Sequence, residues 1–563
     1  MRNFIHEDKL MSRYAQIGWW IKTDRLPQWG PEALIKAVHQ VNRPLFLVEK
    51  ESRIGCAHTG TVMMGSSTTS EGCHDPDGLP LIAFVPPLPP NLLGDTEFQQ
   101  RYGLQYPYLA GAMANGITSV EMVEKMGLAG MLAFFGAAGL SIPEIRSAIQ
   151  QLKTRLPQKP FGFNLIHSPS DPRLEYETVQ LYLDHGVRIV SASAYMDLTL
   201  PLVYYRVRGI HRNSNGAVVA PNAVIAKVSR EEVAKKFFSP PPLKFLRQLV
   251  EKGMITEIEA ELSEHIPMAD ALTAEADSGG HTDNRPAISL LPVMLALRNN
   301  LTEQFRYTVS PAVGLGGGIA TPQSAAAAFA MGAGYVLTGT VNQACVESGT
   351  SDTVRQMLAE AGQADVTMAP AADMFELGIK VQVLKRGTMF PLRAAKLYDL
   401  YNSHSAYTDI PQQQRAILER DFFRKKYEDA WRQTRTFFLS RDPSQVERAE
   451  KDPKHQMALV FRSYLGQSST WANTGEPSRK IDYQIWCGPA IGAFNAWVKE
   501  SCLAKPEQRN IVTVAMNILL GAAAITRIHW LRTQGIKIPH AASYFRPLPL
   551  EEIDGLLSAF KNV

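Results

Sequence analysis

Short apolar runs alternate with helix-like segments along the chain between residues 107 and 342. Helix-like segments such as 119–126, 142–156 and 175–185 separate the runs. Strands that alternate with helices form parallel sheets, and eight such units close into a barrel. The pattern therefore predicts an α/β fold, a (β/α)8 or TIM barrel. The eight expected strands lie at residues 108–113, 128–134, 161–166, 187–192, 224–228, 268–276, 307–313 and 334–337.

The last three strand–helix units carry small or polar residues where each strand ends. These stretches are 277–283 (DSGGHTD), 314–319 (GLGGGI) and 337–340 (LTGT). A (β/α)8 barrel assembles its active site at the C-terminal ends of its strands, often with a phosphate site after the last two. Because glycine has no Cβ, its backbone can approach a ligand closely, and successive N–H groups at a helix start bind anions.

Gly317, Gly318, Gly339 and Thr340 are therefore candidates that hold a phosphate between neighbouring loops. His281 lies one loop earlier and is the candidate that faces the reactive end of the ligand. A single glycine-rich turn is typical of any loop, and a histidine can be structural, so each motif alone leaves both interpretations open. Three such turns in succession favour a binding site.

A phosphate site in these loops indicates a phosphorylated cofactor, and flavin mononucleotide (FMN) fits this topology. Its ring would lie across the barrel mouth, where Ala112, Met113 and Ala114 present backbone after the first strand. Asn164 ends the third strand and Lys227 ends the fifth, where an amide can meet the ring and a cation can stabilise a reduced flavin. The alternatives are that Asn164 forms a turn and that Lys227 snorkels or joins an ion pair.

The remaining sequence suggests two additions to the barrel. Residues 1–95 are expected to be a small N-terminal domain that contains β-strands at 44–50 and 82–85 and a stiff proline-rich linker at 86–90. The barrel would occupy 96–349, with a hairpin or other excursion near 204–216 and a helical insertion at about 229–266 that either shapes substrate access or is a passive elaboration. Residues 350–563 read as a helical C-terminal region, with helices at 353–361, 393–401, 412–435, 456–465, 491–500 and 509–531.

Composition narrows the classes of partner and location. Lysine and arginine number 58 against 54 acids, with no basic arm, so we expect no nucleic acid partner. Five cysteines, few and odd in number, fit free thiols in a reducing compartment, and no apolar signal follows Met1, so we expect a cytoplasmic protein. The apolar run 511–525 is shorter than the ~20 residues of a membrane span and is expected to be a buried helix.

Two short cysteine–histidine clusters raise the question of a metal site. They are Cys56 with His58, and Cys73 with His74. The paired spacing of a zinc site is missing, so we expect ordinary side chains and no metal.

At the motifs above, the sequence resembles a known superfamily. Residues 161–164 (FGFN), 278–281 (SGGH), 317–319 (GGI) and 338–340 (TGT) are similar to motifs of the nitronate monooxygenases and flavin-type enoyl-acyl-carrier-protein reductases. With its N-terminal appendage, its long helical tail and residues 113–118 (MANGIT), the whole chain resembles more narrowly the PfaD-type trans-acting enoyl reductases of polyunsaturated fatty acid and polyketide synthases.

The resemblance implies an FMN-dependent enoyl reductase that uses NADPH and acts in trans on enoyl thioesters of an acyl carrier protein. It implies that His281 is the catalytic-site histidine, which donates a proton or stabilises the thioester oxygen, a role that its near-neutral pKa suits. Glu275 stands roughly where relatives often carry a glutamine near the flavin. The residues implied to bind FMN are Asn164, Gly279, Gly280, Gly317, Gly318, Gly339 and Thr340.

Two rival functions stay open. One is a nitronate monooxygenase, with His281 as the base and oxygen as acceptor, although such an enzyme needs neither the tail nor the N-terminal domain. The other is a flavin-free docking subunit of a large synthase. A basic cluster in the insertion could contact an acidic carrier protein, or be a solvated helix face. It comprises Lys235, Lys236, Lys244 and Arg247. A homodimer is a further possibility.

Overall fold

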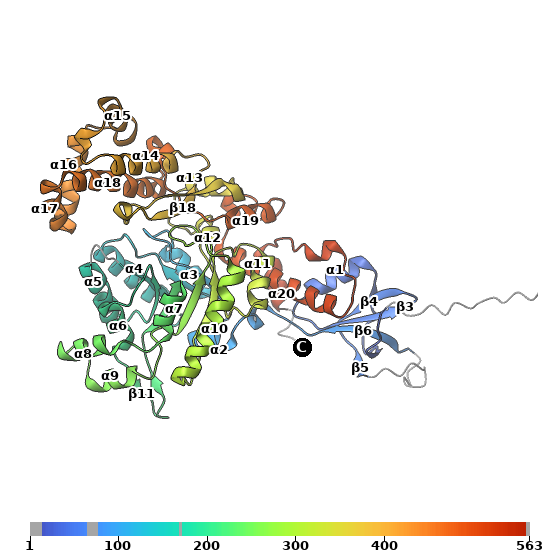
Figure 1. The fold of residues 1–563 in the computed structure, drawn as a ribbon. Coiled ribbons are helices and arrows are strands. Elements are labelled where there is room, and N and C mark those ends of the chain that lie inside the picture. Colours follow the sequence, from blue (N-terminus) through green and yellow to red (C-terminus); the bar gives the residue numbers. More distant parts are fainter. Residues whose placement is uncertain (1–13, 65–76, 168–171, 559–563) are drawn as a thin grey trace, which may run out of the picture. The chain divides into compact units, whose positions relative to one another are not determined.

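The computed structural model describes residues 14–64, 77–167 and 172–558 (Figure 1). By compactness the chain divides into two units. We call Gly94–Ala320 with Met331–Val512 the barrel unit, and Met1–Leu93 with Thr321–Ala330 and Thr513–Val563 the N-terminal unit. The last fifty residues therefore belong with the N-terminal sheet, whereas the sequence groups them with the helices after residue 350.

The barrel unit contains a closed barrel of parallel strands, in the order β10-β13-β14-β15-β16-β7-β8-β9 (Figure 1). This confirms the predicted (β/α)8 fold. Most strand residues are buried, because the barrel interior covers one face of each strand and helices cover the other. The strands are β7 (Tyr108–Ala110), β8 (Leu132–Phe135), β9 (Gly162–Ile166), β10 (Ile189–Ser193), β13 (Ala223–Val228), β14 (Ala271–Glu275), β15 (Ala312–Gly316) and β16 (Val336–Thr338).

Helices follow most of these strands. Helix α6 (Leu200–Val207) was not predicted, because its aromatic residues were interpreted as part of an excursion from the barrel. The hairpin turn predicted beyond this helix is confirmed by β11 (His211–Arg212) and β12 (Val218–Val219). The helical insertion is also confirmed, as α8 (Leu243–Glu251) and α9 (Glu257–Ser263). The other helices of this part are α2 (Thr96–Tyr102), α3 (Val120–Leu128), α4 (Ile142–Arg155), α5 (Pro172–Asp184), α6 (Leu200–Val207), α7 (Glu231–Phe238), α10 (Ala287–Phe305) and α12 (Thr340–Gln343).

Strands β8 and β15 begin furthest beyond their predicted starts, because the preceding helices run further. Helix α3 extends to Leu128, so β8 starts at Leu132. Helix α10 extends to Phe305 and ends at Arg306, which adopts the left-handed conformation with φ 54°, so β15 starts at Ala312. Gly314 is therefore a strand residue and not part of the turn. A Cβ at Gly314 would lie 2.2 Å from the ring of Tyr335, which explains the glycine.

The barrel unit continues into a region that is mostly helical. The helix predicted over 412–435 is broken: α15 (Gln412–Ile417) passes into a π-helical turn (Leu418–Phe423), and Arg424 is left-handed with φ 56°. An antiparallel hairpin of β17 (Val366–Pro370) and β18 (Lys380–Leu384), which was not predicted, lies between the helices predicted at 353–361 and 393–401. The helices are α13 (Asp352–Ala359), α14 (Phe390–Ser403), α15, α16 (Tyr427–Arg441), α17 (Pro443–Lys451), α18 (Pro453–Thr474) and α19 (Ala490–Val498).

The N-terminal unit contains a six-stranded antiparallel sheet in the order β2-β4-β3-β6-β1-β5. The strands predicted at 44–50 and 82–85 are confirmed as β3 and β6. Its core joins residues of α1 (Pro31–His39) and α20 (Ile511–Thr533) to the sheet, among them Leu34, Leu47 and Leu531. The strands are β1 (Gly18–Ile21), β2 (Gln28–Trp29), β3 (Leu45–Lys50), β4 (Arg53–Ala57), β5 (Thr61–Met64) and β6 (Leu79–Val85), and α11 (Pro322–Ala330) and α21 (Leu550–Ser558) complete the unit.

Helix α20 is longer than the apolar run 511–525. Its 23 residues are long and apolar enough to cross a membrane by length and composition, yet 89% of its most apolar window is buried within the structure, as in a core helix. Cys73 and His74 lie outside the described residues. Within the described ranges, no group of three or more potential ligand side chains could hold a metal ion. Cys56, Cys345, Cys487 and Cys502 are not joined in disulfides.

Candidate active site

A cavity of about 1430 Å³ lies at the C-terminal ends of the barrel strands. One side is formed by the strand ends and the loops that follow them. The other side is formed by the β17–β18 hairpin, parts of α16 and α18, and several residues between 484 and 490. The structure brings all the predicted site residues to this cavity, whereas none of the described residues of α8 or α9 lines it. These site residues are Ala112, Met113, Ala114, Asn164, Lys227, Glu275, Gly279, Gly280, His281, Gly317, Gly318, Gly339 and Thr340.

The two expected phosphate turns lie side by side. Strands β15 and β16 pair in parallel with Gly316 opposite Leu337. The turn glycines, Gly318 and Gly339, each follow two residues after this pair. A Cβ at either Gly318 or Gly339 would meet nothing within 4 Å, so both positions open onto free space. Gly318 also has φ 76°, which glycine adopts at no steric cost. This pair of open turns fits a phosphate between the loops.

Other glycines of the motifs serve the packing of the protein itself. A Cβ at Gly317 would lie 2.6 Å from the carbonyl of Ala276, and one at Gly279 would lie 2.9 Å from the backbone of Cys487. Gly280 pairs with Gln382 of β18 through hydrogen bonds of 2.9 and 2.8 Å. All three glycines line the cavity. Close backbone packing explains the glycines at 279 and 317, whereas Gly280 is explained by its φ of 81°, which glycine adopts at no steric cost.

Asn164 lies within strand β9 and not in a turn, so the turn-forming alternative is wrong. Its side-chain amide donates to the carbonyl of Ser191 at 3.3 Å and to Oγ of Ser193 at 3.4 Å. In the loop after β7, which is separated from β9 only by β8, the N–H of Met113 donates to Oγ1 of Thr118 at 2.9 Å. Hydrogen bonds to a neighbouring strand and within this loop thus fix the amide and the backbone expected to meet the ring.

Lys227 and Glu275 form an ion pair beside the cavity. Nζ of Lys227 donates to Oε1 of Glu275 at 2.7 Å, and Oγ of Ser278 donates to the same oxygen at 3.2 Å. The ion-pair interpretation of Lys227 is therefore confirmed. Because both side chains also line the cavity, the pair places a cation and a carboxylate next to any bound ring.

His281 faces the cavity and pairs with a residue that the sequence analysis missed. Its Nε2 lies 3.0 Å from Oδ2 of Asp373, in the connection between β17 and β18. Burial favours the neutral imidazole, but the hydrogen bond and charge of Asp373 outweigh it, so the pKa of His281 is raised. The same partnership outweighs the effect of burial on Asp373 and lowers the pKa of its carboxyl. The imidazolium is thus held at higher pH than in a free histidine.

The loop that carries His281 is fastened at both ends. At its start, the side-chain amide of Gln382 donates to Oδ1 of Asp277 and to the carbonyl of Ser278, each at 2.8 Å. At its end, Arg230 grips Asp283 with two bonds of 2.9 Å. These bonds to Arg230 are the largest cause that lowers the pKa of Asp283, to about 2. The imidazole therefore stands on a rigid support.

A second imidazole–carboxylate pair lines the same cavity and was also missed. Nδ1 of His167 lies 3.2 Å from Oε2 of the buried Glu175. The other oxygen of Glu175 accepts from Tyr195 OH at 3.0 Å and from the hydroxyl of Thr199. The ring of His167 stacks on Tyr195 with centroids 5.4 Å apart. The Glu175 carboxylate thus accepts from three side chains, and these bonds hold the pair in a fixed position in the lining of the cavity.

The sequence matches two protein-family models that cover the barrel and the helical region beside the cavity. The model of the family described as nitronate monooxygenase matches residues 97–409, more than half of the chain. The chain belongs to the nitronate monooxygenase family. A second model, described as the inserted helical domain of [acyl-carrier-protein] S-malonyltransferase, matches residues 404–483. The helical region that covers the cavity therefore has its own relatives. The family is flavin-dependent.

The proteins similar to this chain include an enoyl reductase domain, a fatty acid synthase subunit and a polyketide biosynthesis protein. A crystal structure of the enoyl reductase domain of MlnA, from the macrolactin biosynthesis cluster of Bacillus amyloliquefaciens, has 39% identity and a TM-score of 0.75, covering 79% of this chain and all of that one. A polyunsaturated fatty acid synthase component of Thraustochytrium sp. is 46% identical over 78% of this chain and 30% of its own. Polyketide biosynthesis protein PksE of Bacillus subtilis is 44% identical over 77% and 56%. The chain thus spans little more than half, or less, of these two curated relatives.

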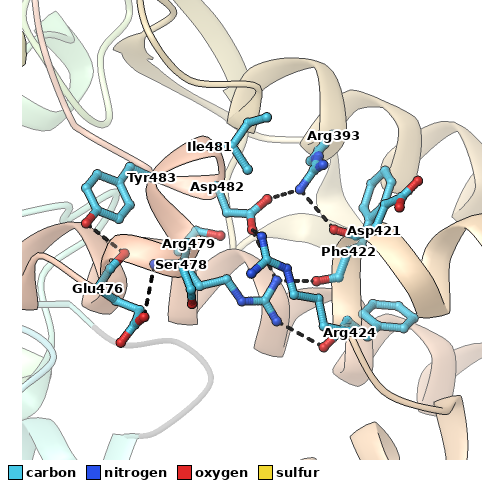
Figure 2. A network of polar contacts seen from close by, with 12 residues as sticks. Arg393, Asp421, Phe422, Arg424, Glu476, Ser478, Arg479, Ile481, Asp482 and Tyr483 are labelled. Carbon is cyan, nitrogen blue, oxygen red and sulfur yellow. Dashed lines mark hydrogen bonds and ion pairs between the residues drawn. The ribbon is translucent and has the colours of Figure 1, made fainter.

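The end of the helical match is held by a buried network (Figure 2). Asp482 is 0% exposed, and its carboxylate accepts from Arg393, from Arg479 at 3.1 Å and from Tyr464 OH at 2.7 Å. Arg424 lies 3.7 Å from its second oxygen. Arg393 and Arg479 also donate to the carbonyls of Asp421, Phe422 and Phe423, as Figure 2 shows for the first two. One carboxylate therefore ties α14, the π-helical turn and the segment after α18 together.

Proposed function

We propose that this protein is an FMN-dependent enoyl reductase that uses NADPH to reduce enoyl thioesters. The observation that carries the proposal is the convergence of two open glycine turns, at Gly318 and Gly339, and an imidazole, His281, on one cavity. The likeness to the MlnA enoyl reductase domain supports the choice of reaction.

Each part of the cavity has a role in this proposal. The N–H groups around Gly318 and Gly339 bind the phosphate of FMN, and Gly317 and Thr340 shape the same turns. Asn164 and the backbone of 112–114 meet the ring. The Lys227–Glu275 pair stands beside it and offers a cation to a reduced ring. When bound, FMN would pass a hydride from NADPH to the substrate.

His281 supplies the proton in the same reaction. Hydride addition to the β-carbon of an enoyl thioester develops negative charge on the thioester oxygen and the α-carbon. An imidazolium that faces the cavity can stabilise this charge and protonate the α-carbon. Because Asp373 raises the pKa of His281, the donor stays charged to a higher pH than a free histidine would.

We further propose that the substrate arrives on an acyl carrier protein of a polyunsaturated fatty acid or polyketide synthase. One named relative is a polyunsaturated fatty acid synthase subunit and another is a polyketide biosynthesis protein. The covering helices resemble a domain of an enzyme that acts on acyl carrier proteins. The cavity holds apolar side chains at its rim, including Met196, Leu377 and Phe437, which suit an acyl chain. A cytoplasmic location, no nucleic acid partner, no membrane span and a possible homodimer stay predictions.

The test compares two reactions on the same purified protein. We expect a two-banded yellow flavin spectrum, or its appearance after FMN is added, and oxidation of NADPH when crotonyl thioester is supplied. Propionate 3-nitronate with oxygen serves as the alternative substrate, because a nitronate monooxygenase would consume it without NADPH. Turnover of the nitronate alone would contradict the proposal. Protein that takes up no flavin would instead support a docking subunit.

A further inference from the structure

We propose that Asp373 is the positioning residue of this site: it accepts a hydrogen bond from Nε2 of His281 and so assigns Nδ1 as the atom that delivers the proton to substrate. This inference rests on the proposed function for its chemistry. It adds a residue from outside the barrel, on the β17–β18 connection, to the machinery of the reaction.

The bond pattern of Asp373 determines which nitrogen carries which hydrogen. Oδ1 of Asp373 accepts from the backbone N–H of Met374 at 3.1 Å, which orients the carboxylate. Oδ2 lies 3.0 Å from Nε2 of His281. An ionised carboxylate can only accept, so Nε2 must carry a hydrogen in both charge states of the ring. Nδ1 is therefore the nitrogen that gains and loses the proton.

The other carboxylates around His281 already have partners. Lys227 and Glu275, on β13 and β14, bind each other at 2.7 Å. On the loop of His281 itself, Asp277 accepts from Asn284 and Gln382 at 2.8 Å each, and Asp283 is paired with Arg230. From the hairpin, the exposed Lys380 lines the same cavity. Asp373 is thus the carboxylate that bonds directly to the imidazole.

The turn that carries Asp373 is anchored on both sides. Just before it, Nε of Arg462 donates to the carbonyl of Ala372 at 3.0 Å. Further along, Gln382 pairs with Gly280 on the loop of His281. The distance between Asp373 and the imidazole is therefore set by the fold and not by a mobile loop.

The proposed step balances as follows. The carbon–carbon double bond of the enoyl thioester gains a hydride at the β-carbon, which originates in NADPH, and its π electrons pass to the thioester oxygen and α-carbon. The N–H bond at Nδ1 of the imidazolium breaks, and the electron pair of that bond stays on Nδ1. The proton forms a C–H bond with the electron pair at the α-carbon. The ring is left neutral, with its Nε2 hydrogen still donated to Asp373. Water then returns a proton to Nδ1.

The test uses three variants of the full-length protein loaded with FMN. Asp373→Asn removes the charge, Asp373→Glu keeps it, and Glu376→Gln is a matched control. The control removes the same kind of carboxylate–imidazole pair, three residues away on the same turn, but from His455, which is buried and does not line the cavity. A merely structural role of Asp373 would make Asp373→Asn behave like Glu376→Gln.

Two readouts are measured on each variant. The first is the pKa of the His281 ring by NMR of 13C-labelled histidine, with the signal among 13 histidines assigned by its loss in His281→Ala. The second is the pH profile of kcat for enoyl reduction, beside the rate of NADPH-dependent flavin bleaching as a step that needs no proton donor. We expect Asp373→Asn to lower the His281 pKa by about one unit or more and to move the alkaline fall of kcat down equally.

The other variants give results that would either support or overturn the role of Asp373. Asp373→Glu should restore most of the pKa and the profile, while Glu376→Gln should lower the melting temperature and leave both unchanged. Bleaching by NADPH should be the same in all variants. An unchanged His281 pKa in Asp373→Asn, or an equal shift in Glu376→Gln, would overturn the inference. If the wild-type protein reduces no enoyl thioester, the proposed function fails, but the NMR titration still tests the pairing.

Discussion

Asp482 and Asp373 are both carboxylates of the region beyond the barrel, and their surroundings differ in kind. Asp482 is 0% exposed and is ringed by Arg393, Arg424 and Arg479. The side chain of Asp373 is 53% exposed and meets one imidazole at the edge of a cavity. A saturated, buried charge holds elements together, whereas a half-exposed charge with one titratable partner can tune that partner. The same residue type thus serves stability in one place and reactivity in the other.

Removal of the buried charge should have the largest effect. Asp482→Ala leaves three arginines without their shared carboxylate, and we expect a loss of roughly 3–5 kcal/mol in the free energy of unfolding. Urea denaturation followed by circular dichroism measures it. Asp352→Asn is the control, because that side chain is 94% exposed and pairs only within its own helix. Equal effects of the two variants would erase the distinction drawn above.

Loss of the imidazole should instead abolish the reaction and spare the fold. In His281→Ala we expect kcat for enoyl reduction to fall about 10²–10⁴-fold, because the proton donor is gone. The flavin spectrum and the melting temperature should stay close to those of the wild type. Full retained turnover would show that another group, such as His167, delivers the proton.

Gly339→Val separates cofactor binding from stability. Its φ of −130° is outside the left-handed region that favours glycine, and a Cβ there would meet no protein atom within 4 Å. The protein should therefore fold normally, while the side chain fills the space that we assign to the FMN phosphate. We expect FMN to bind about 10–100-fold more weakly, in line with ~1–3 kcal/mol for overpacking. Quenching of FMN fluorescence on titration measures the affinity, and an unchanged value would move the phosphate elsewhere.

Asp283 pairs with an arginine, as Asp482 does, but it lies beside the cavity, as Asp373 does. The loss of stability in Asp283→Asn should be the smallest of the expected effects. Its lowered pKa, about 2, means that its pairing with Arg230 stabilises the fold above the usual carboxyl pKa near 4, and that this stability is lost as pH falls through 2. Because the pair is partly exposed, we expect only about 1 kcal/mol from it. Asp283→Asn should thus be less stable than the wild type at pH 7, and urea unfolding should show this difference shrinking as the pH falls from 4 through 2. A constant difference across this range would point to a packing effect.

The barrel and most of its site could be predicted because their signals are local. Each strand and the loop after it are contiguous in sequence, so the glycines at 317, 318 and 339 and the histidine at 281 already mark one end of the barrel. The topology then brings them together, since the C-terminal ends of parallel strands meet at one rim. The reasons for individual glycines were less readable, because Gly279 and Gly317 face other backbone segments.

The rest of the site depends on pairings between distant residues. Gly280 and Gln382 form an isolated bridge across about a hundred positions, and no local pattern near either residue announces it. The hairpin strands are only five residues each and lie among helices, so their alternation was too short to read. Asp373 and its role follow from that hairpin. Likewise, the break at Arg424 interrupts a run whose composition favours one helix throughout.

The most direct test of the account is a single turnover without oxygen. The purified protein is loaded with FMN, bleached with one equivalent of NADPH in a stopped-flow instrument, and then mixed with crotonyl thioester. We predict that the yellow absorbance returns at a rate that rises with thioester concentration, and that one butyryl thioester forms per flavin. Bleached protein that stays colourless with the thioester, yet regains colour with oxygen, would contradict the assignment of this cavity to enoyl reduction.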